Sequence, residues 1–266
     1  PRHTIVSNPT PQSMNITILQ TDILWAQPEA NRQRISQLIE HLGPTDLIVL
    51  PEMFSTGFAT QPEGIAEGDG GSLRWMAAMA ASTQAAVAGS IAIREGERYY
   101  NRFYFVKPDG ELAFYDKRHL FTYGGEDKAF TPGRDRVVVE WRGVRILLQV
   151  CYDLRFPVFS RNHDDYDLVL YVANWPEGRR QAWDLLLRAR AIENQCYVVG
   201  VNRVGKAQVN YNGGSAIVDF QGTLLAACVD GQESSATAQL NMPRLQAFRK
   251  QFPVLHDADA FRLCEL

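Results

Sequence analysis

The chain has 266 residues, 45% of them hydrophobic, and no linker rich in glycine, serine or proline divides it, so we expect a single domain with a large core. The net charge is −3, and the lysines and arginines are scattered. This argues against a nucleic-acid-binding surface, and no apolar run approaches the ~20 residues that a membrane span needs.

The cysteines and histidines are dispersed along the chain. The four cysteines, Cys151, Cys196, Cys228 and Cys264, show neither close pairing nor the spacing of metal ligands. The sequence therefore predicts no disulfide framework, no zinc or other metal site and no cofactor. It also favours a reducing, cytoplasmic location.

The first thirteen residues differ from the rest. They are polar, contain proline and lack the apolar middle of a signal peptide. Met14 opens the first credible strand. We therefore expect residues 1–13 to be a leader or extension outside the fold, and residues 14–266 to form the domain.

The first half of the chain alternates strands and helices and then turns to hairpins. A helix begins at Pro28, a residue favoured in the first helical turn, and ends before Gly43. Residues 47–50 (LIVL) form a continuous apolar run, which is typical of a strand covered on both faces. Further strands are predicted at residues 15–20, 85–93, 99–106 and 111–115, and a second helix at residues 72–84.

The second half begins with a long polar loop, residues 118–135, and loops of that length in compact domains are usually functional or disordered. Strands at residues 137–141 and 144–150 are expected to pair across a turn. The whole pattern predicts two mixed sheets face to face with helices outside. The remaining predicted elements are strands at residues 168–173, 196–201, 215–218, 224–227 and 236–240, and helices at residues 179–194 and 242–251.

Three of these strands end in a chemically reactive residue. Glu52 follows residues 47–50, Lys117 follows residues 111–115, and Cys151 follows residues 144–150. Catalytic groups collect at the carboxyl ends of strands in α/β proteins. If the three strands lie side by side, a carboxylate, an ammonium and a thiol converge on one pocket.

Such a trio suits cleavage of a C–N bond. A free thiol has a pKa of about 8.5, so it needs a base to become nucleophilic at neutral pH. A carboxylate can take that proton and return it to departing ammonia, while a lysine holds the charge that develops on a carbonyl oxygen. Taken singly, each residue has a simpler interpretation: an inert core cysteine, or a solvated glutamate or lysine.

The three motifs together resemble a known family. Glu52 in LIVLPEMFSTGF, Lys117 in YDKRHLF and Cys151 in VCYDLRFP match, in order and surroundings, the Glu-Lys-Cys triad of the nitrilase, or carbon–nitrogen hydrolase, superfamily. The resemblance continues through ANWP at residues 173–176, ARAIENQ at 189–195 and FRKQFPVLHDADAF at 248–261.

The resemblance implies an α/β fold, a four-layer α-β-β-α sandwich of two mixed β-sheets with outer helices. It also implies a homodimer or larger homo-oligomer. In the family, the oxyanion is bound by the lysine, here Lys117, and by the backbone N–H after the cysteine, here that of Tyr152. Glu126, in GGEDKAFTPG, matches a second family glutamate that positions the lysine. Alternatively, Glu126 pairs with Lys128 or Arg134 on the surface.

The residues of four motifs, PEMFSTGF, CYDLRFP, ANWP and RAIENQ, are most similar to those of the omega-amidase branch. Members of that branch hydrolyse the terminal amide of 2-oxoglutaramate or 2-oxosuccinamate. A small anionic amide needs a cationic anchor, and Arg155 can grip a carboxylate with two hydrogen bonds. The alternative for Arg155 is a structural ion pair with Asp153 or Glu193. Three aromatic residues near the reactive strand ends either wall the pocket or belong to the core: Phe58, Phe121 and Trp175.

Other functions remain open on the sequence alone. The nearest are other amidases of the superfamily, acting on deaminated glutathione, N-carbamoyl compounds or aliphatic amides and nitriles. A non-catalytic dimeric scaffold and a Cys–His site using His119 or His163 are further alternatives. A metal hydrolase lacks a ligand cluster, and a phosphate site lacks its glycine-rich loop. A cysteine phosphatase would carry arginine at position 157, where this chain has proline.

Overall fold

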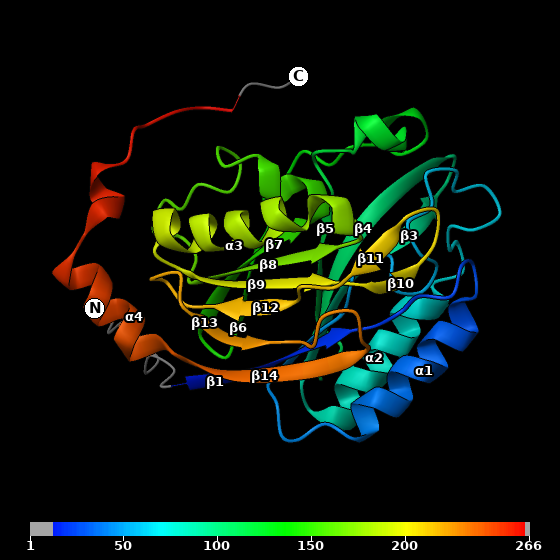
Figure 1. Cartoon of the computed structure of the whole chain (residues 1–266), viewed down its shortest axis with the longest axis horizontal. Helices are drawn as coiled ribbons and strands as arrows, with labels where there is room; N and C mark the ends of the chain where they lie inside the picture. The colour runs from blue at the N-terminus through cyan, green and yellow to red at the C-terminus, as the bar shows by residue number, and fades with distance from the viewer. Residues whose placement is uncertain (1–12, 264–266) are drawn as a thin grey trace, which may run out of the picture.

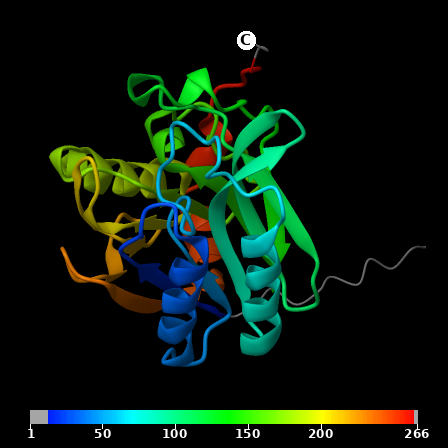
Figure 2. The same cartoon turned by 90° about the vertical axis from the view of Figure 1, so that its right-hand side faces the viewer.

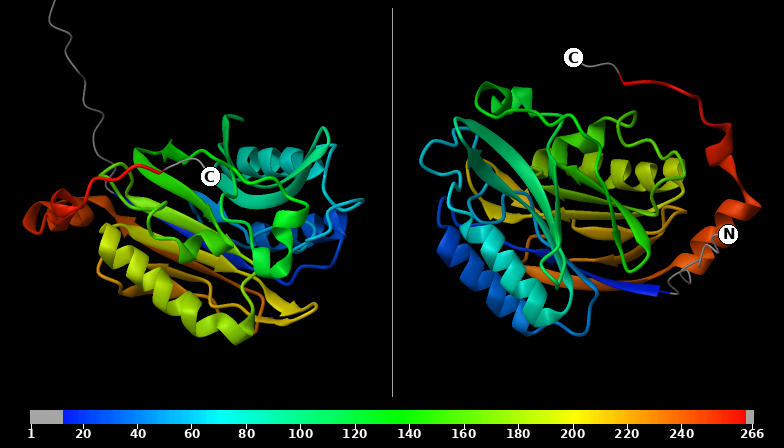
Figure 3. Two further views of the ribbon diagram at one scale, coloured as in Figure 1. Left: turned by 90° about the horizontal axis from the view of Figure 1, so that it is seen from above. Right: turned by 180° about the vertical axis from the view of Figure 1, so that it is seen from behind.

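The fold was analysed in a computed structural model that describes residues 13–263. These residues form two six-stranded mixed sheets that pack face to face (Figures 1 and 3). In spatial order the first sheet contains β14 (Ser234–Asn241), β1 (Ser13–Gln20), β2 (Leu47–Val49), β3 (Ala86–Glu95), β4 (Arg98–Val106) and β5 (Leu112–Asp116). The second contains β13 (Leu224–Ala227), β12 (Ala216–Val218), β9 (Tyr197–Asn202), β8 (Leu168–Ala173), β7 (Val144–Val150) and β6 (Val138–Trp141).

Helices cover the outer faces of both sheets. Helices α1 (Pro28–Glu40) and α2 (Gly71–Thr83) lie side by side on the first sheet (Figure 2). Helix α3 (Arg180–Asn194) packs on the second sheet, on the opposite side of the molecule (Figure 3). Helix α4 (Met242–Gln251) lies at one end of the sandwich (Figure 1). The expected order of layers, helix, sheet, sheet and helix, is therefore confirmed.

The centre of each sheet is parallel, and the outer strands are antiparallel. β1, β2 and β3 run parallel in the first sheet, and β7, β8 and β9 run parallel in the second. All residues of β2, β8 and β9 are buried, which explains their continuous apolar sequences. β5 reaches the same direction as β2 and β3 through two antiparallel pairings. The carboxyl ends of β2 and β5 therefore lie at the same edge of the first sheet.

One apolar core joins the two sheets. It contains side chains of the first sheet, such as Val49 and Phe103, together with side chains of the second, such as Leu148. On the outer face of the second sheet, Gly200 in β9 lets α3 approach closely, since a Cβ there would come within 2.6 Å of Leu187 Cδ1. Close packing therefore holds the two sheets against each other and α3 against the second sheet.

The predicted elements occur in the structure with small shifts of their ends, and two strands were not predicted. β10 (Val204–Lys206) and β11 (Asn210–Asn212) form a separate two-stranded ribbon. Their three-residue segments are mostly polar, so the sequence offers no apolar alternation there. The long loop 118–135 contains two short 3-10 turns, η1 (Thr122–Gly124) and η2 (Glu126–Lys128). Further 3-10 turns are η3 (Cys151–Arg155), η4 (Glu177–Arg179) and η5 (Val254–Asp257).

The ends of the chain are only partly covered. Residues 1–12 of the expected leader and residues 264–266 lie outside the described residues. Ser13, which we assigned to the leader, is instead the first residue of β1 and pairs with Asn241 of β14. Between residues 13 and 263, no helix has the length and apolar character needed to cross a membrane.

Candidate active site

The three strand ends meet at one point. Glu52 follows β2 and Lys117 follows β5 in the first sheet, while Cys151 follows β7 in the second. Lys117 Nζ donates to Glu52 Oε1 at 3.0 Å and to Glu126 Oε2 at 2.8 Å. The side chains of Glu52, Lys117 and Glu126 are fully buried. Glu126 therefore binds Lys117 in the interior and does not lie on the surface.

Two asparagines hold the carboxylates in place, and the sequence analysis did not identify either of them. Asn101 Nδ2 donates to Glu52 Oε1 at 2.7 Å and to Glu126 Oε1 at 3.0 Å. The Asn174 backbone N–H donates to Glu52 Oε2 at 2.7 Å. The Asn174 carbonyl lies 4.0 Å from Cys151 Sγ, so this residue touches both the thiol and the carboxylate. The ANWP motif was the signal for Asn174.

Cys151 lies on a strained turn. Its φ is +46°, in the left-handed region that non-glycine residues rarely adopt. The turn converts the end of β7 into η3, as in other strand-to-helix turns that present a nucleophile. The next N–H, that of Tyr152, belongs to the first turn of η3, where backbone donors have no partner within the helix. The sequence analysis expects this N–H to bind an oxyanion, and that role stays a prediction.

Asp153 fixes this turn, and its role was also missed from the sequence. It is fully buried. Its Oδ2 accepts from Val150 N and Tyr115 Oη, both at 2.8 Å. Its Oδ1 accepts from His119 N at 3.0 Å and contacts His119 Nδ1 at 2.7 Å. These bonds tie the turn at Cys151 in the second sheet to the segment that follows Lys117 in the first.

The site favours a protonated thiol beside a charged lysine. Burial raises the pKa of the Cys151 thiol well above its ordinary value, the charge of Glu52 raises it further, and Lys117 opposes the shift. For Lys117, burial lowers the pKa, but Glu126 and Glu52 outweigh it and the pKa is raised. Burial also raises the pKa of Glu126, against the effect of Lys117. At neutral pH the thiol therefore needs a base before it can attack.

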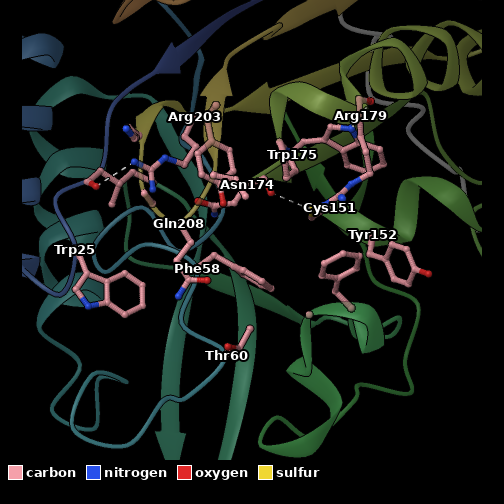
Figure 4. Close-up of a pocket in the computed structure, with 18 of the residues that line it drawn as sticks. Trp25, Phe58, Thr60, Cys151, Tyr152, Asn174, Trp175, Arg179, Arg203 and Gln208 are labelled. Carbon is pink, nitrogen blue, oxygen red and sulfur yellow. Dashed lines mark hydrogen bonds between the residues drawn. The ribbon is translucent and has the colours of Figure 1, made fainter.

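A cavity of about 730 Å³ opens above this group (Figure 4). Cys151 is part of its lining, whereas the buried Glu52, Lys117 and Glu126 lie beneath it. The structure brings all the predicted substrate-binding residues into the same lining, together with Tyr152: Phe58, Phe121, Arg155 and Trp175. The aromatic side chains therefore wall a pocket, although Trp175 is also almost fully buried.

Arg155 is exposed and stacks on an aromatic ring. Its guanidinium carbon lies 4.9 Å from the centroid of the Trp175 ring. The alternative ion pairs are not formed: Asp153 binds the groups described above, and Glu193 pairs with Arg190 at 2.9 Å. Arg155 thus faces the cavity with its charge available.

The cavity also contains residues that the sequence analysis did not single out. Arg179, just ahead of α3, lies 5.2 Å over the Phe121 ring. Arg203, which follows β9, donates to Asp22 Oδ1 at 2.6 Å. Figure 4 places Arg179 near Trp175 and Cys151, and places Arg203, Gln208 and Trp25 on the other side of the cavity.

A Cys–His site is not assembled. His119 contacts Asp153, and His163 packs against Phe261 with ring centroids 5.3 Å apart. Neither histidine lines the cavity. Within residues 13–263, no group of three or more His, Cys, Asp or Glu side chains is arranged to hold a metal ion. Cys151, Cys196 and Cys228 are free thiols.

Comparison with known proteins places the chain in a family. Residues 15–250 match the family model for carbon-nitrogen hydrolase. The chain belongs to the carbon–nitrogen hydrolase family. It is therefore an amidase-type hydrolase of carbon–nitrogen bonds, and the superfamily expected from the motifs is confirmed.

Relatives within this family are similar over nearly their whole length. The chain is 47% identical to the omega-amidase YafV of Yersinia enterocolitica over 94% of this chain and 99% of the relative. It is 34% identical to the 2-oxoglutaramate amidase of Bacillus subtilis over 91% of this chain and 96% of the relative. Among solved structures, a carbon–nitrogen hydrolase superfamily protein of Xanthomonas campestris, with an arsenic adduct in its active site, superposes with a TM-score of 0.92. It is 43% identical and covers 95% of this chain and 99% of its own.

Proposed function

We propose that the protein is an omega-amidase. It hydrolyses the terminal amide of a small 2-oxo dicarboxylic acid monoamide, 2-oxoglutaramate or 2-oxosuccinamate, to the 2-oxo diacid and ammonia. The observation that carries this proposal is the 47% identity to an omega-amidase across almost the full length of both chains. The buried Glu52–Lys117 contact beside Cys151 supports it, because this arrangement suits attack on an amide carbon.

The first half-reaction forms a thioester. Glu52 takes the thiol proton as Cys151 Sγ attacks the amide carbon, which matches the raised pKa of that thiol. Lys117 Nζ and the Tyr152 N–H bind the oxyanion. Glu52 then gives its proton to the nitrogen, the C–N bond breaks, and ammonia leaves.

The second half-reaction releases the acid. Glu52, again a carboxylate, takes a proton from water as the water oxygen attacks the thioester carbon. The same oxyanion donors serve this step. The C–S bond breaks, and Cys151 regains its proton. Glu126 and Asn101 keep Lys117 and Glu52 in fixed positions throughout. Glu126 accepts two hydrogen bonds from Lys117 Nζ, and Asn101 Nδ2 donates to both Glu52 and Glu126.

Substrate orientation follows from the lining. The amide end lies at Cys151, and Arg155 binds the far carboxylate over the Trp175 ring. Phe58 and Phe121 pack on the carbon chain between the two ends. The other superfamily amidases are less favoured, because the relatives similar over full length carry the omega-amidase and 2-oxoglutaramate amidase names.

The direct test is ammonia release across a panel of substrates. We expect release from 2-oxoglutaramate and 2-oxosuccinamate to exceed that from N-carbamoyl compounds, plain amides and nitriles. Cys151→Ala should abolish release while the far-UV circular dichroism spectrum stays unchanged, and Cys228→Ala is the matched control for loss of a buried thiol elsewhere. Comparable turnover by Cys151→Ala, or preference for another substrate class, would overturn the proposal.

We also propose that the enzyme acts in the cytoplasm as a homodimer or larger homo-oligomer. The outer helix α3 exposes Leu185 and Ile192, at 60% and 55%, which is the kind of surface that a second copy covers. Sedimentation analysis tests this association. A monomer at micromolar concentration would contradict it.

A further inference from the structure

Two arginines in the cavity lining have no acidic partner. Among residues 13–263, neither Arg155 nor Arg179 forms an ion pair, although both line the space beside Cys151. Other arginines nearby are neutralised. Arg203 donates to Asp22 at 2.6 Å, and Arg180, the residue after Arg179, contacts Asp184 at 2.7 Å and Asp230 at 3.0 Å. Two positive charges without an acidic partner, those of Arg155 and Arg179, therefore belong to the part of the cavity lining beside Trp175 and Phe121.

Arg179 is held firmly at this end. Its carbonyl oxygen accepts a hydrogen bond from Trp175 Nε1 at 2.8 Å, so its backbone is joined to the ring on which Arg155 stacks. Its guanidinium lies over Phe121, 5.2 Å from the ring centroid. The Phe121 N–H in turn donates to Glu126 Oε2 at 2.7 Å. The position of Arg179 is thus connected to the buried catalytic carboxylates through a single residue.

This geometry suits an anionic ligand. Arg179 is partly buried, and a partly desolvated cation without a counterion is costly unless a ligand supplies the opposite charge. Guanidinium groups bind planar carboxylates with two parallel hydrogen bonds. A 2-oxo acid presents a carboxylate and an adjacent carbonyl oxygen, which together offer acceptors to two such groups.

We propose that Arg179 and Arg155 form a carboxylate-binding subsite, and that Arg179 determines the preference for amides with an anionic far end over neutral amides. This inference rests on the proposed function, since it assigns the substrate class of that same site. The charge of Lys206 is an alternative source of attraction for the anionic substrate. Lys206 is the exposed last residue of β10 and also lines the cavity. Gln208, two residues further along the chain, lies on the side of the cavity away from Arg179 in Figure 4.

The test compares an anionic with a neutral amide. Arg179→Gln should raise KM for 2-oxoglutaramate by roughly 10- to 100-fold, as expected for loss of a charge-assisted hydrogen bond. The same variant should leave kcat/KM for pentanamide within about twofold, because a neutral amide makes no such bond. Arg179→Lys, which keeps the charge but not the fork, should give an intermediate KM. Arg180→Gln, outside the cavity, should match the unmodified enzyme.

Other outcomes overturn the inference. Equal losses for the anionic and the neutral amide would mean that Arg179 has only a structural role. An equal rise in KM for Lys206→Gln would mean that overall charge, rather than a subsite, attracts the substrate.

A binding measurement separates this inference from the proposed function. If the enzyme does not turn over 2-oxoglutaramate, the proposed function fails, but calorimetric titration with 2-oxoglutarate still tests the subsite. Binding to the unmodified enzyme and a 10- to 100-fold weaker binding to Arg179→Gln would support the subsite. Failure of the unmodified enzyme to bind 2-oxoglutarate would overturn it.

Discussion

We predict that Asp153 supports both stability and catalysis, although it is fully buried and does not line the cavity. Its two oxygens accept hydrogen bonds from Val150 and Tyr115 on one side and from His119 on the other. Asp153→Asn keeps the shape but places an NH2 group against one of these sides. A tyrosine hydroxyl can rotate to accept, whereas the backbone N–H of Val150 or His119 cannot. Either orientation of the amide therefore leaves one buried backbone donor unpaired.

The magnitude follows from these bonds. One unpaired buried donor costs about 1–3 kcal/mol, and the remaining bonds weaken when the acceptor loses its charge, so we expect a total loss of about 3–5 kcal/mol. That is a large share of the ~5–15 kcal/mol that stabilises a typical domain. The turn that holds Cys151 at a φ of +46° also loses its support. A displacement of ~1 Å at the nucleophile lowers kcat by roughly 100-fold.

Two measurements test this reasoning. Urea unfolding followed by circular dichroism gives the change in stability, and kcat is measured in buffer where the variant remains folded. Tyr115→Phe is the comparison variant, because it keeps the carboxylate and removes only the hydroxyl, which donates to Asp153 Oδ2 and accepts from Arg118 N. We expect it to lose no more than about half as much stability. Asp153→Asn with the stability and kcat of the unmodified enzyme would refute the reasoning.

Two further predictions concern pH and the position of Lys117. Burial raises the pKa of Cys196, and that of Cys228 to about 11. The stability that these buried thiols contribute is therefore complete below the ordinary thiol pKa and is lost as the pH rises toward the raised pKa values of the folded protein. Urea unfolding should therefore show a lower free energy of unfolding at pH 10 than at pH 8. Above pH 9 the expected loss is about 1.4 kcal/mol per pH unit for each such thiol. A free energy of unfolding that rises over this range would contradict the raised thiol pKa values. Gly133→Ala would put a Cβ 2.0 Å from the carbonyl oxygen of Asp116. The clash lies next to the hydrogen bond that Gly133 N donates to Lys117 O. We therefore expect the variant to be less stable by about 1–3 kcal/mol and to have a lower kcat. Gly43→Ala, where a Cβ meets nothing within 4 Å, is the control, and equal effects of the two would contradict the steric argument.

The reactive ends of strands were predictable because burial and reactivity both leave a mark in the sequence. An apolar run followed at once by Glu52, Lys117 or Cys151 is informative, and the structure places these residues together. The layers were also predictable, since continuous apolar runs and hairpin turns distinguish central from outer strands.

The supporting groups were not predictable in the same way. Asn101 lies within β4 beside Arg102, where a polar pair gives no local sign of burial, yet it is 1% exposed. Its position depends on pairing with Ala92 of β3 and on a hydrogen bond from Ser90 Oγ, and neither can be read from local sequence. The position of Arg179 could not be predicted either, because its contact with Phe121 joins two segments that are distant in the chain.

Because the site is divided between the two sheets, the packing between the sheets affects its geometry. Glu52 and Lys117 belong to the first sheet, and Cys151 and Asn174 belong to the second. The separation of nucleophile and base is therefore a separation between sheets, set by the volume of the side chains packed between them. We therefore expect a substitution in that shared interior, at Val49 or Leu148, to shift Glu52 relative to Cys151 although neither residue lines the cavity. A change in the volume of the core between the sheets should therefore alter the reaction rate as well as the stability.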